Sequence, residues 1–227
     1  MGKAKLKKFQ DLNEFSNVFQ NTDWHKRNCI NYCGENINIK GNWRKIVFEN
    51  DKPIVLELAC GKGEYTVAMA QTYPNQNFIG IDLKGNRIWK GAKYALELNL
   101  SNVHFLRTRI ELLSHFFDTQ EINDIWITFP DPHLRGTKAQ SRLSSERYLN
   151  IYKPLLAVGA TINLKTDSKP LYDFTKLTIN KLNLNLVTDI EDIYSHQNIP
   201  EILNIKTYYE KKHLANGLKI YYLKFKF

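Results

Sequence analysis

Three features in the first half of the chain have the residue types of a nucleoside-binding site. Gly61 and Gly63 follow an apolar run directly and let the backbone turn sharply and approach a ligand. Asp82 ends the next apolar run, where its carboxylate can accept hydrogen bonds from both hydroxyls of a ribose. Glu57 lies inside the first run, and a buried acid is costly unless it has a partner. A bound sulfonium or amino group, or backbone donors of the glycine loop, would supply that partner.

The glycine loop departs from the pattern of a dinucleotide site. Thr66 stands where the motif G-x-G-x-x-G would place its third glycine. Glu64, which opens the next predicted helix, would also repel a pyrophosphate bound at the start of that helix. S-adenosylmethionine carries no phosphate, so this acid does not oppose its binding. The loop therefore favours S-adenosylmethionine over a nicotinamide dinucleotide.

A further acid, Asp131, lies between Pro130 and Pro132 at the end of a later apolar run. The two prolines restrict the backbone, and we expect them to aim the carboxylate out of the strand end. Amino-methyltransferases carry a related site in another order, with Asp or Asn followed by Pro-Pro-Tyr. The order here differs, which argues against a methyltransferase for another RNA base or for a protein amide.

These residues need a scaffold, and from residue 53 onward the sequence alternates short apolar runs with helical patterns. Strands separated by helices of about 10–15 residues predict an α/β fold, a doubly wound, mostly parallel sheet with ligands at the carboxyl ends of its strands. We predict an N-terminal arm with short helices over residues 1–50 and a Rossmann-like methyltransferase domain, with an antiparallel C-terminal strand, over residues 51–227. The predicted strands are residues 54–59, 78–82, 103–106, 122–129, 160–165, 184–189 and 218–225, and the predicted helices are residues 64–73, 85–98, 110–117, 144–157 and 169–182.

Charge and composition indicate the class of binding partner and the cellular compartment. The formal net charge is +9 and the sequence pI about 9.3, which favours a nucleic-acid partner. No run approaches the roughly 18 apolar residues of a membrane helix, so we expect no membrane association. The three cysteines, Cys29, Cys33 and Cys60, form no zinc motif and predict reduced thiols in a cytoplasmic protein. We expect a monomer or homodimer, with the lysine-rich residues 3–8 as a solvated tail or an RNA contact.

The chain resembles the bacterial tRNA (guanine-N7-)-methyltransferase family in four separated motifs, from about residue 53 to the C-terminus. Residues 56–63 (Leu-Glu-Leu-Ala-Cys-Gly-Lys-Gly) are similar to its first motif, and residues 80–82 with Arg87 and Ile88 to its second. Residues 127–132 (Ile-Thr-Phe-Pro-Asp-Pro) are similar to the third, and residues 164–167 with Leu171 and Tyr172 to the fourth. A Thr-x-x-Glu element near the family's C-terminus is matched by residues 207–210. The order and spacing of these motifs make the resemblance specific.

The resemblance implies an enzyme that transfers a methyl group from S-adenosylmethionine to N7 of guanine 46 in the variable loop of tRNA. The cofactor-binding positions are then Glu57, Gly61, Gly63, Asp82, Arg109, Ile110 and Asp131. The substrate-binding positions are Arg135, Asp167, Thr207, Tyr208, Tyr209 and Glu210. The alternative that stays open is an S-adenosylmethionine-dependent methyltransferase acting on a different RNA base or on a protein.

Two segments depart from the family pattern. Arg109 and Ile110 occupy positions where the family often has Asp-Ala beside the adenine, so we expect backbone groups of residues 108–110 to recognise that ring. After Pro132 the family commonly runs Trp-Pro-Lys-Lys-Arg-His, whereas this chain has His-Leu-Arg-Gly-Thr-Lys, a thinner basic cluster. We predict that its cations Arg135 and Lys138, together with Arg142, contact RNA phosphates.

The chemistry of guanine N7 assigns a role to Asp131. N7 carries a lone pair and no proton, so its methylation needs no general base, and the enzyme must chiefly align the reacting atoms. Methylation leaves positive charge on the purine, which a fixed carboxylate can stabilise. We therefore predict that Asp131 is catalytic through positioning and charge stabilisation. A non-catalytic RNA-binding module would not need Glu57, Asp82 and Asp131 together.

Overall fold

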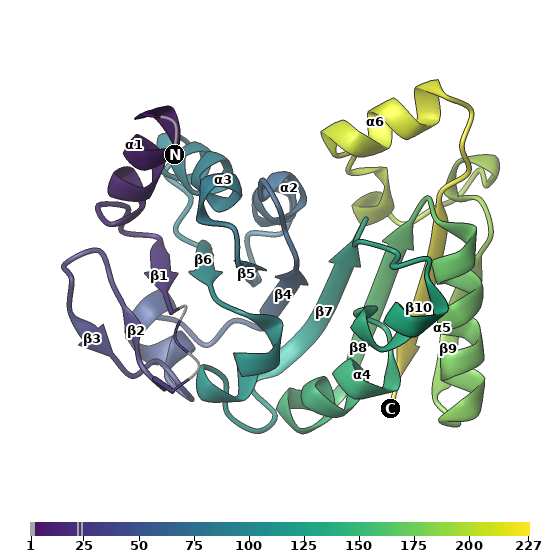
Figure 1. The fold of residues 1–227 in the computed structure, drawn as a ribbon, viewed down its shortest axis with the longest axis horizontal. Coiled ribbons are helices and arrows are strands. Elements are labelled where there is room, and N and C mark those ends of the chain that lie inside the picture. Colours follow the sequence, from purple (N-terminus) through teal and green to yellow (C-terminus); the bar gives the residue numbers. More distant parts are fainter. Residues whose placement is uncertain (1–2, 22, 24) are drawn as a thin grey trace.

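The computed structural model describes residues 3–21, 23 and 25–227, and a ten-stranded sheet forms its centre (Figure 1). The strand order is β3-β2-β1-β6-β5-β4-β7-β8-β10-β9. The central strands are parallel: β4 (Ile54–Leu58), β5 (Asn77–Asp82), β6 (Val103–Arg107), β7 (Ile122–Thr128) and β8 (Leu156–Thr166). β10 (Tyr221–Lys226) is antiparallel to both of its neighbours, β8 and β9 (Asn185–Ile190). The predicted mostly parallel sheet with an antiparallel C-terminal strand is confirmed.

Helices cover both faces of the sheet, which explains why the central strands are apolar. On one face α2 (Glu64–Thr72) and α3 (Gly85–Glu97) bury Val67 and Ile88 in one hydrophobic cluster. On the other face α4 (Glu146–Tyr152), α5 (Lys169–Lys181) and the short helix Ile110–His115 contribute to a second cluster. All the residues of β4 are consequently buried, including its one acid.

The N-terminal stretch extends the same sheet, where the sequence predicted an arm with short helices. β1 (Val18–Gln20) runs parallel to β6, and β2 (Cys29–Ile30) and β3 (Asn36–Ile37) continue outward as antiparallel strands. These strands are two or three residues long, so the sequence holds no alternation long enough to reveal them. The π-helix Trp43–Phe48 then leads to β4, with Trp43 Nε1 donating to the carbonyl of Phe116 at 2.8 Å.

The lysine-rich start of the chain lies in α1 (Lys3–Leu12), which packs on α3. Trp89 Nε1 on α3 donates to Asp11 Oδ2 at 2.7 Å, and Lys8 Nζ lies 4.7 Å from the centre of the Trp89 ring. These contacts tie α1 to the helical layer beside the glycine loop.

Two elements of the second half differ from the predicted ones. The helix predicted over residues 144–157 divides into α4 and the 3-10 turn Lys153–Leu155, because Pro154 has no amide proton to continue an α-helix. Residues 207–210 begin an unpredicted helix, α6 (Tyr208–Ala215), which lies above the carboxyl ends of β7 and β8 in Figure 1. Among the residues that the structure describes, no helix is long and apolar enough to cross a membrane.

Candidate active site

The glycine loop and Asp82 form one hydrogen-bonded unit at the carboxyl ends of β4 and β5. The N–H of Gly61 donates to Asp82 Oδ2 at 3.0 Å, and the N–H of Lys84 donates to Asp82 Oδ1 at 2.7 Å. Gly61 and Gly63 have φ angles of 58° and 67°, in the left-handed region that glycine adopts without strain. Asp82 is thereby held in place while its carboxylate oxygens keep lone pairs for ligand hydroxyls.

Glu57 is buried beside this unit, and its partners are two hydroxyl groups. Thr66 Oγ1 and Thr128 Oγ1 each donate a short hydrogen bond to a different oxygen of the carboxylate. Burial raises the pKa of Glu57 to about 7; the two hydroxyls oppose this rise, and the charge of Asp82 adds to it. We expected a ligand cation or loop amides as partners, and the structure instead supplies Thr66, the residue that replaces the third glycine.

A pocket of about 510 Å³ opens between the glycine loop, the end of β7 and the start of α6. The lining residues are Glu57, Ala59, Cys60, Gly61, Lys62, Glu64, Tyr65, Arg87, Thr128, Phe129, Thr207 and Tyr209. Cations stand at Lys62 and Arg87, and acids at Glu57 and Glu64, so the pocket can receive both a cationic and an anionic group.

A neighbouring hollow brings together the residues predicted for the adenosine end. Its lining includes Asp82, Arg109 and Ile110, with Thr108, Glu111 and Tyr148 around them. Ala59 borders both hollows, so one elongated ligand can pass from one to the other over the end of β4. Tyr148 Oη donates to Glu111 Oε1 at 2.8 Å, which fixes the outer wall of this hollow.

The end of β7 carries an unusual backbone and an exposed acid. Phe129 and His133 have φ angles of 47° and 42°, which side chains larger than glycine rarely adopt. Phe129 lines the pocket, and its ring stacks on His213 with the ring centres 6.0 Å apart. Asp131 lies two residues further on with 74% of its side chain exposed, and its Oδ1 accepts the N–H of His133 at 3.0 Å. Its carboxylate thus lies outside the pocket lining, on the loop that leaves the pocket wall.

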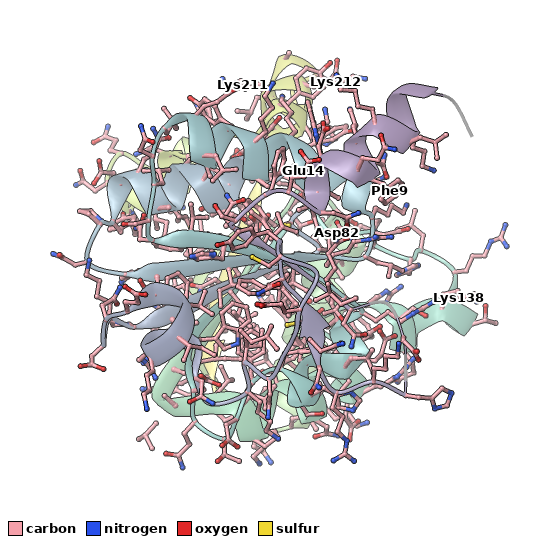
Figure 2. All side chains as sticks on the ribbon, turned by 90° about the vertical axis from the view of Figure 1, so that its left-hand side faces the viewer. Phe9, Glu14, Asp82, Lys138, Lys211 and Lys212 are labelled. Carbon is pink, nitrogen blue, oxygen red and sulfur yellow. The ribbon has the colours of Figure 1, made fainter. Side chains whose placement is uncertain are left out.

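Arg142 corrects one prediction for this loop. Its side chain is buried, with Nε donating to the carbonyl of Pro132 at 3.0 Å and Nη2 to that of His133 at 3.1 Å. The guanidinium also lies 4.3 Å from the centre of the Phe174 ring. Arg142 therefore holds the loop around Asp131 in shape and is not available to RNA phosphates. Arg135 and Lys138 are exposed, and Figure 2 shows Lys138 at the outer edge of the molecule.

A buried ion pair fixes the C-terminal wall of the pocket. Lys165 Nζ lies 2.8 Å from Glu210 Oε1, and both side chains are fully buried. Lys165 also donates to the carbonyls of Leu203 and Ile205 at 2.9 Å each, and Tyr194 Oη donates to Glu210 Oε1 at 2.6 Å. Burial lowers the pKa of Lys165, and the charge and hydrogen bond of Glu210 oppose this. Glu210, predicted to contact substrate, is placed here as the internal anchor of α6.

The other predicted substrate residues surround the start of α6. Thr207 Oγ1 accepts the N–H of Glu210 at 3.2 Å and so caps the helix, and Thr207 and Tyr209 both line the pocket. Tyr208 is exposed beside them, and its N–H donates to Glu64 Oε2 at 2.7 Å across the pocket. Asp167 lies at the end of β8 with Oδ2 3.4 Å from His213 Nδ1 on α6.

Several residues that shape the site were not singled out for these roles in the sequence. Thr128 precedes Phe129 in the quoted motif, but a threonine there does not reveal that its hydroxyl meets Glu57. Tyr148 and Glu111 come together from α4 and the helix after β6. A usable signal existed for Thr66, because a hydroxyl in place of the third glycine, on the helix that follows a strand with a buried acid, suggests a hydrogen bond between the two.

Comparisons with known proteins agree with this geometry. A family model described as "Putative methyltransferase" matches residues 51–223. The tRNA (guanine-N(7)-)-methyltransferase of Bacteroides fragilis is 42% identical over 225 residues, with 99% of this chain and 86% of the relative covered. That of Christiangramia forsetii is 42% identical, with 99% and 98% covered. Among solved structures, the 16S rRNA methyltransferase KamB gives a TM-score of 0.63 at 13% identity over 85% of this chain and 95% of that chain, a likeness of fold alone. This chain belongs to the tRNA (guanine-N(7)-)-methyltransferase family.

Proposed function

We propose that this protein transfers the methyl group of S-adenosylmethionine to N7 of guanine 46 in the variable loop of tRNA. The proposal rests above all on one observation: Glu57 and Asp82 lie at adjacent strand ends beside a pocket that continues to Phe129 and α6. Relatives named for guanine-N(7) methylation of tRNA cover nearly the whole chain.

The residues present fit S-adenosylmethionine at both of its ends. Asp82 is fixed by two backbone amides and has lone pairs left for ribose hydroxyls. Glu57 is buried with its pKa raised, so a cationic ligand in the pocket would favour its charged form. The hollow of Arg109 and Ile110 continues from Asp82 and would take the adenine. The bound molecule supplies an electrophilic methyl group on a sulfonium.

The chain's own task is then to position the guanine. The lone pair of N7 forms the new bond to the methyl carbon while the carbon–sulfur bond breaks and its electron pair stays on sulfur. No proton leaves N7, so no general base is required, and alignment dominates the barrier. Asp131 stabilises the positive charge that develops on the purine. Arg142 assists by holding the loop backbone on both sides of Asp131.

The predicted substrate-binding residues fall into two groups, those that are accessible to RNA and the buried Glu210. Thr207, Tyr208 and Tyr209 border the pocket and would contact the target nucleotide. Arg135 on the loop after β7 and Asp167 at the end of β8 would contact neighbouring parts of the RNA. Glu210 acts as a positioning residue, because its buried pair with Lys165 fixes the helix that carries the two tyrosines.

The test is methyl transfer by the purified protein to unmodified tRNA, followed by borohydride reduction and aniline cleavage, which cuts at 7-methylguanine. We expect one cut in the variable loop, and none in a matched tRNA that carries adenine at position 46. Methyl incorporation without a cut would establish a different RNA base as the target. Methylation of protein but not of RNA would overturn the proposal in favour of the other alternative.

A further inference from the structure

A second hollow lies beside the active-site pocket, in the groove between α2 and α3. It has a volume of about 590 Å³ and is lined by Lys62, Gly63, Glu64, Val67, Ala68, Gln71, Lys90, Gly91 and Tyr94. Lys62 and Glu64 also line the active-site pocket, so the two spaces adjoin at the glycine loop. A strand of RNA that delivers a guanine to the pocket can therefore continue into the groove.

Two glycines give the groove its smooth apolar floor. A Cβ atom on Gly91 would lie 2.6 Å from the carbonyl oxygen of Lys62, and one on Gly63 would lie 2.8 Å or less from the Phe105 ring. No larger residue fits at these positions, because α3 packs directly against the backbone of the glycine loop. Tyr94 follows Gly91 by three residues on the same face of α3, with 49% of its surface exposed. The groove thus has an apolar floor with an exposed aromatic ring at its edge.

Cations border this apolar surface. Lys62 and Lys90 line the groove, and Arg87 is an exposed cation of α3 that lines the adjoining pocket. Lys90 Nζ lies 3.3 Å from Glu64 Oε1, which holds it at the entrance between groove and pocket. Together with the net charge of +9, this border matches a phosphate backbone.

We propose that the groove between α2 and α3 is a second nucleotide site, which binds the base of a nucleotide flanking the methylated guanine. The base stacks on Tyr94 over the floor of Gly91, Val67 and Ala68, and Lys62 binds the adjoining phosphate, while Lys90 stays paired with Glu64. Single-stranded RNA is held in this way elsewhere, by aromatic rings beneath the bases and cations along the backbone. The inference rests on the proposed RNA substrate and adds a contact outside the catalytic pocket.

The first test compares tRNA affinity and single-turnover methylation in Tyr94→Ala, Tyr94→Phe and Tyr32→Ala. Tyr32 is a matched control, because it is 50% exposed and lies in the turn between β2 and β3 at the far edge of the sheet. We expect Tyr94→Ala to weaken tRNA binding about tenfold and Tyr94→Phe to bind like the wild type. Tyr32→Ala should bind tRNA like the wild type. The affinity for S-adenosylhomocysteine should be unchanged in every variant. Wild-type tRNA affinity in Tyr94→Ala overturns the proposal.

The second test identifies the occupant through a double-mutant cycle. Each nucleotide flanking the target guanine is replaced in turn by an abasic residue, and binding is measured with the wild type and with Tyr94→Ala. If a base occupies the groove, one abasic position weakens wild-type binding but costs Tyr94→Ala nothing further. Additive losses at every position overturn the proposal while wild-type methylation of tRNA leaves the proposed function intact. A wild-type protein that methylates no tRNA overturns the proposed function instead.

Discussion

The two sides of the active site are built in opposite ways. On the cofactor side the polar groups are internal: Glu57 bonds two threonine hydroxyls, and Asp82 is held by two backbone amides. On the RNA side Asp131, Arg135 and Lys138 stand in solvent on the loop after β7. The side that we propose for the cofactor is therefore organised before any ligand binds, whereas the side that we propose for RNA presents exposed charged groups, of which Arg135 and Lys138 can attract a polyanion.

The start of α6 belongs to both sides. Its tyrosines are exposed, but its anchor Glu210 is as buried as Glu57. A buried ion pair thus anchors a helix whose outer tyrosines are exposed to solvent. If this division holds, changes on the buried side will act first on stability, and changes on the exposed side will act on turnover and RNA affinity.

The largest effect is expected for Lys165→Ala. The substitution leaves the Glu210 carboxylate buried with Tyr194 as its remaining hydrogen-bond donor from a side chain, and breaking a buried pair in this way costs about 3–5 kcal/mol. Urea unfolding followed by circular dichroism measures the loss. The control is Lys169→Ala, which breaks a 2.7 Å pair with Asp173 whose side chains are 56% and 49% exposed. That control should lose little stability, because solvent screens an exposed pair. Equal losses of unfolding free energy in the two variants would show that the buried pair stabilises the protein no more than an exposed pair does.

Next in size is the pH dependence that Glu57 gives to folding. Its pKa is raised to about 7 by burial, so the folded state binds this proton more tightly than the unfolded state does. The contribution to stability is therefore fully present below the ordinary pKa near 4.5 and is lost as pH rises through 7, by about 3 kcal/mol. The difference in unfolding free energy between wild type and Glu57→Gln, measured from pH 4 to 8, isolates this group. A difference independent of pH would show that folding does not raise the pKa of Glu57.

Asp131→Asn tests the exposed side. The variant keeps the shape of the side chain but loses the negative charge, so we expect methyl transfer to slow about 100-fold. The affinity for S-adenosylhomocysteine and the unfolding free energy should change little, because 74% of the side chain is exposed. His133→Ala is the control, since it retains the backbone N–H that Asp131 accepts. Near-wild-type turnover in Asp131→Asn would exclude the charge-stabilising role.

The comparison also explains what could be predicted from the sequence. The strands that carry Glu57 and Asp82, and the strand that precedes Asp131, are apolar runs covered on both faces. The polar residues that follow each run therefore marked its end in the sequence. β1 was not predicted, because three residues form a strand there only through pairing with β6. Glu210 was predicted to contact substrate because of the resemblance, and only Lys165 on a distant strand explains its burial. Local apolar patterns were enough to predict the strands and helices. Whether a charged side chain is buried or exposed depends on partners far away in the sequence, which these patterns do not show.

The smallest effects are expected for Arg135→Ala and Lys138→Ala. Each removes one exposed cation that we assign to a phosphate, so each should lower the slope of log affinity for tRNA against log salt by about 1. At low salt the affinity should fall severalfold, while turnover with saturating tRNA stays near that of the wild type. The matched control is Lys45→Ala, an exposed cation in the π-helix before β4, near the amino ends of the strands. If Lys45→Ala changes the salt slope as much as Lys138→Ala does, the net charge of the protein attracts the RNA, and the loop after β7 makes no specific phosphate contact.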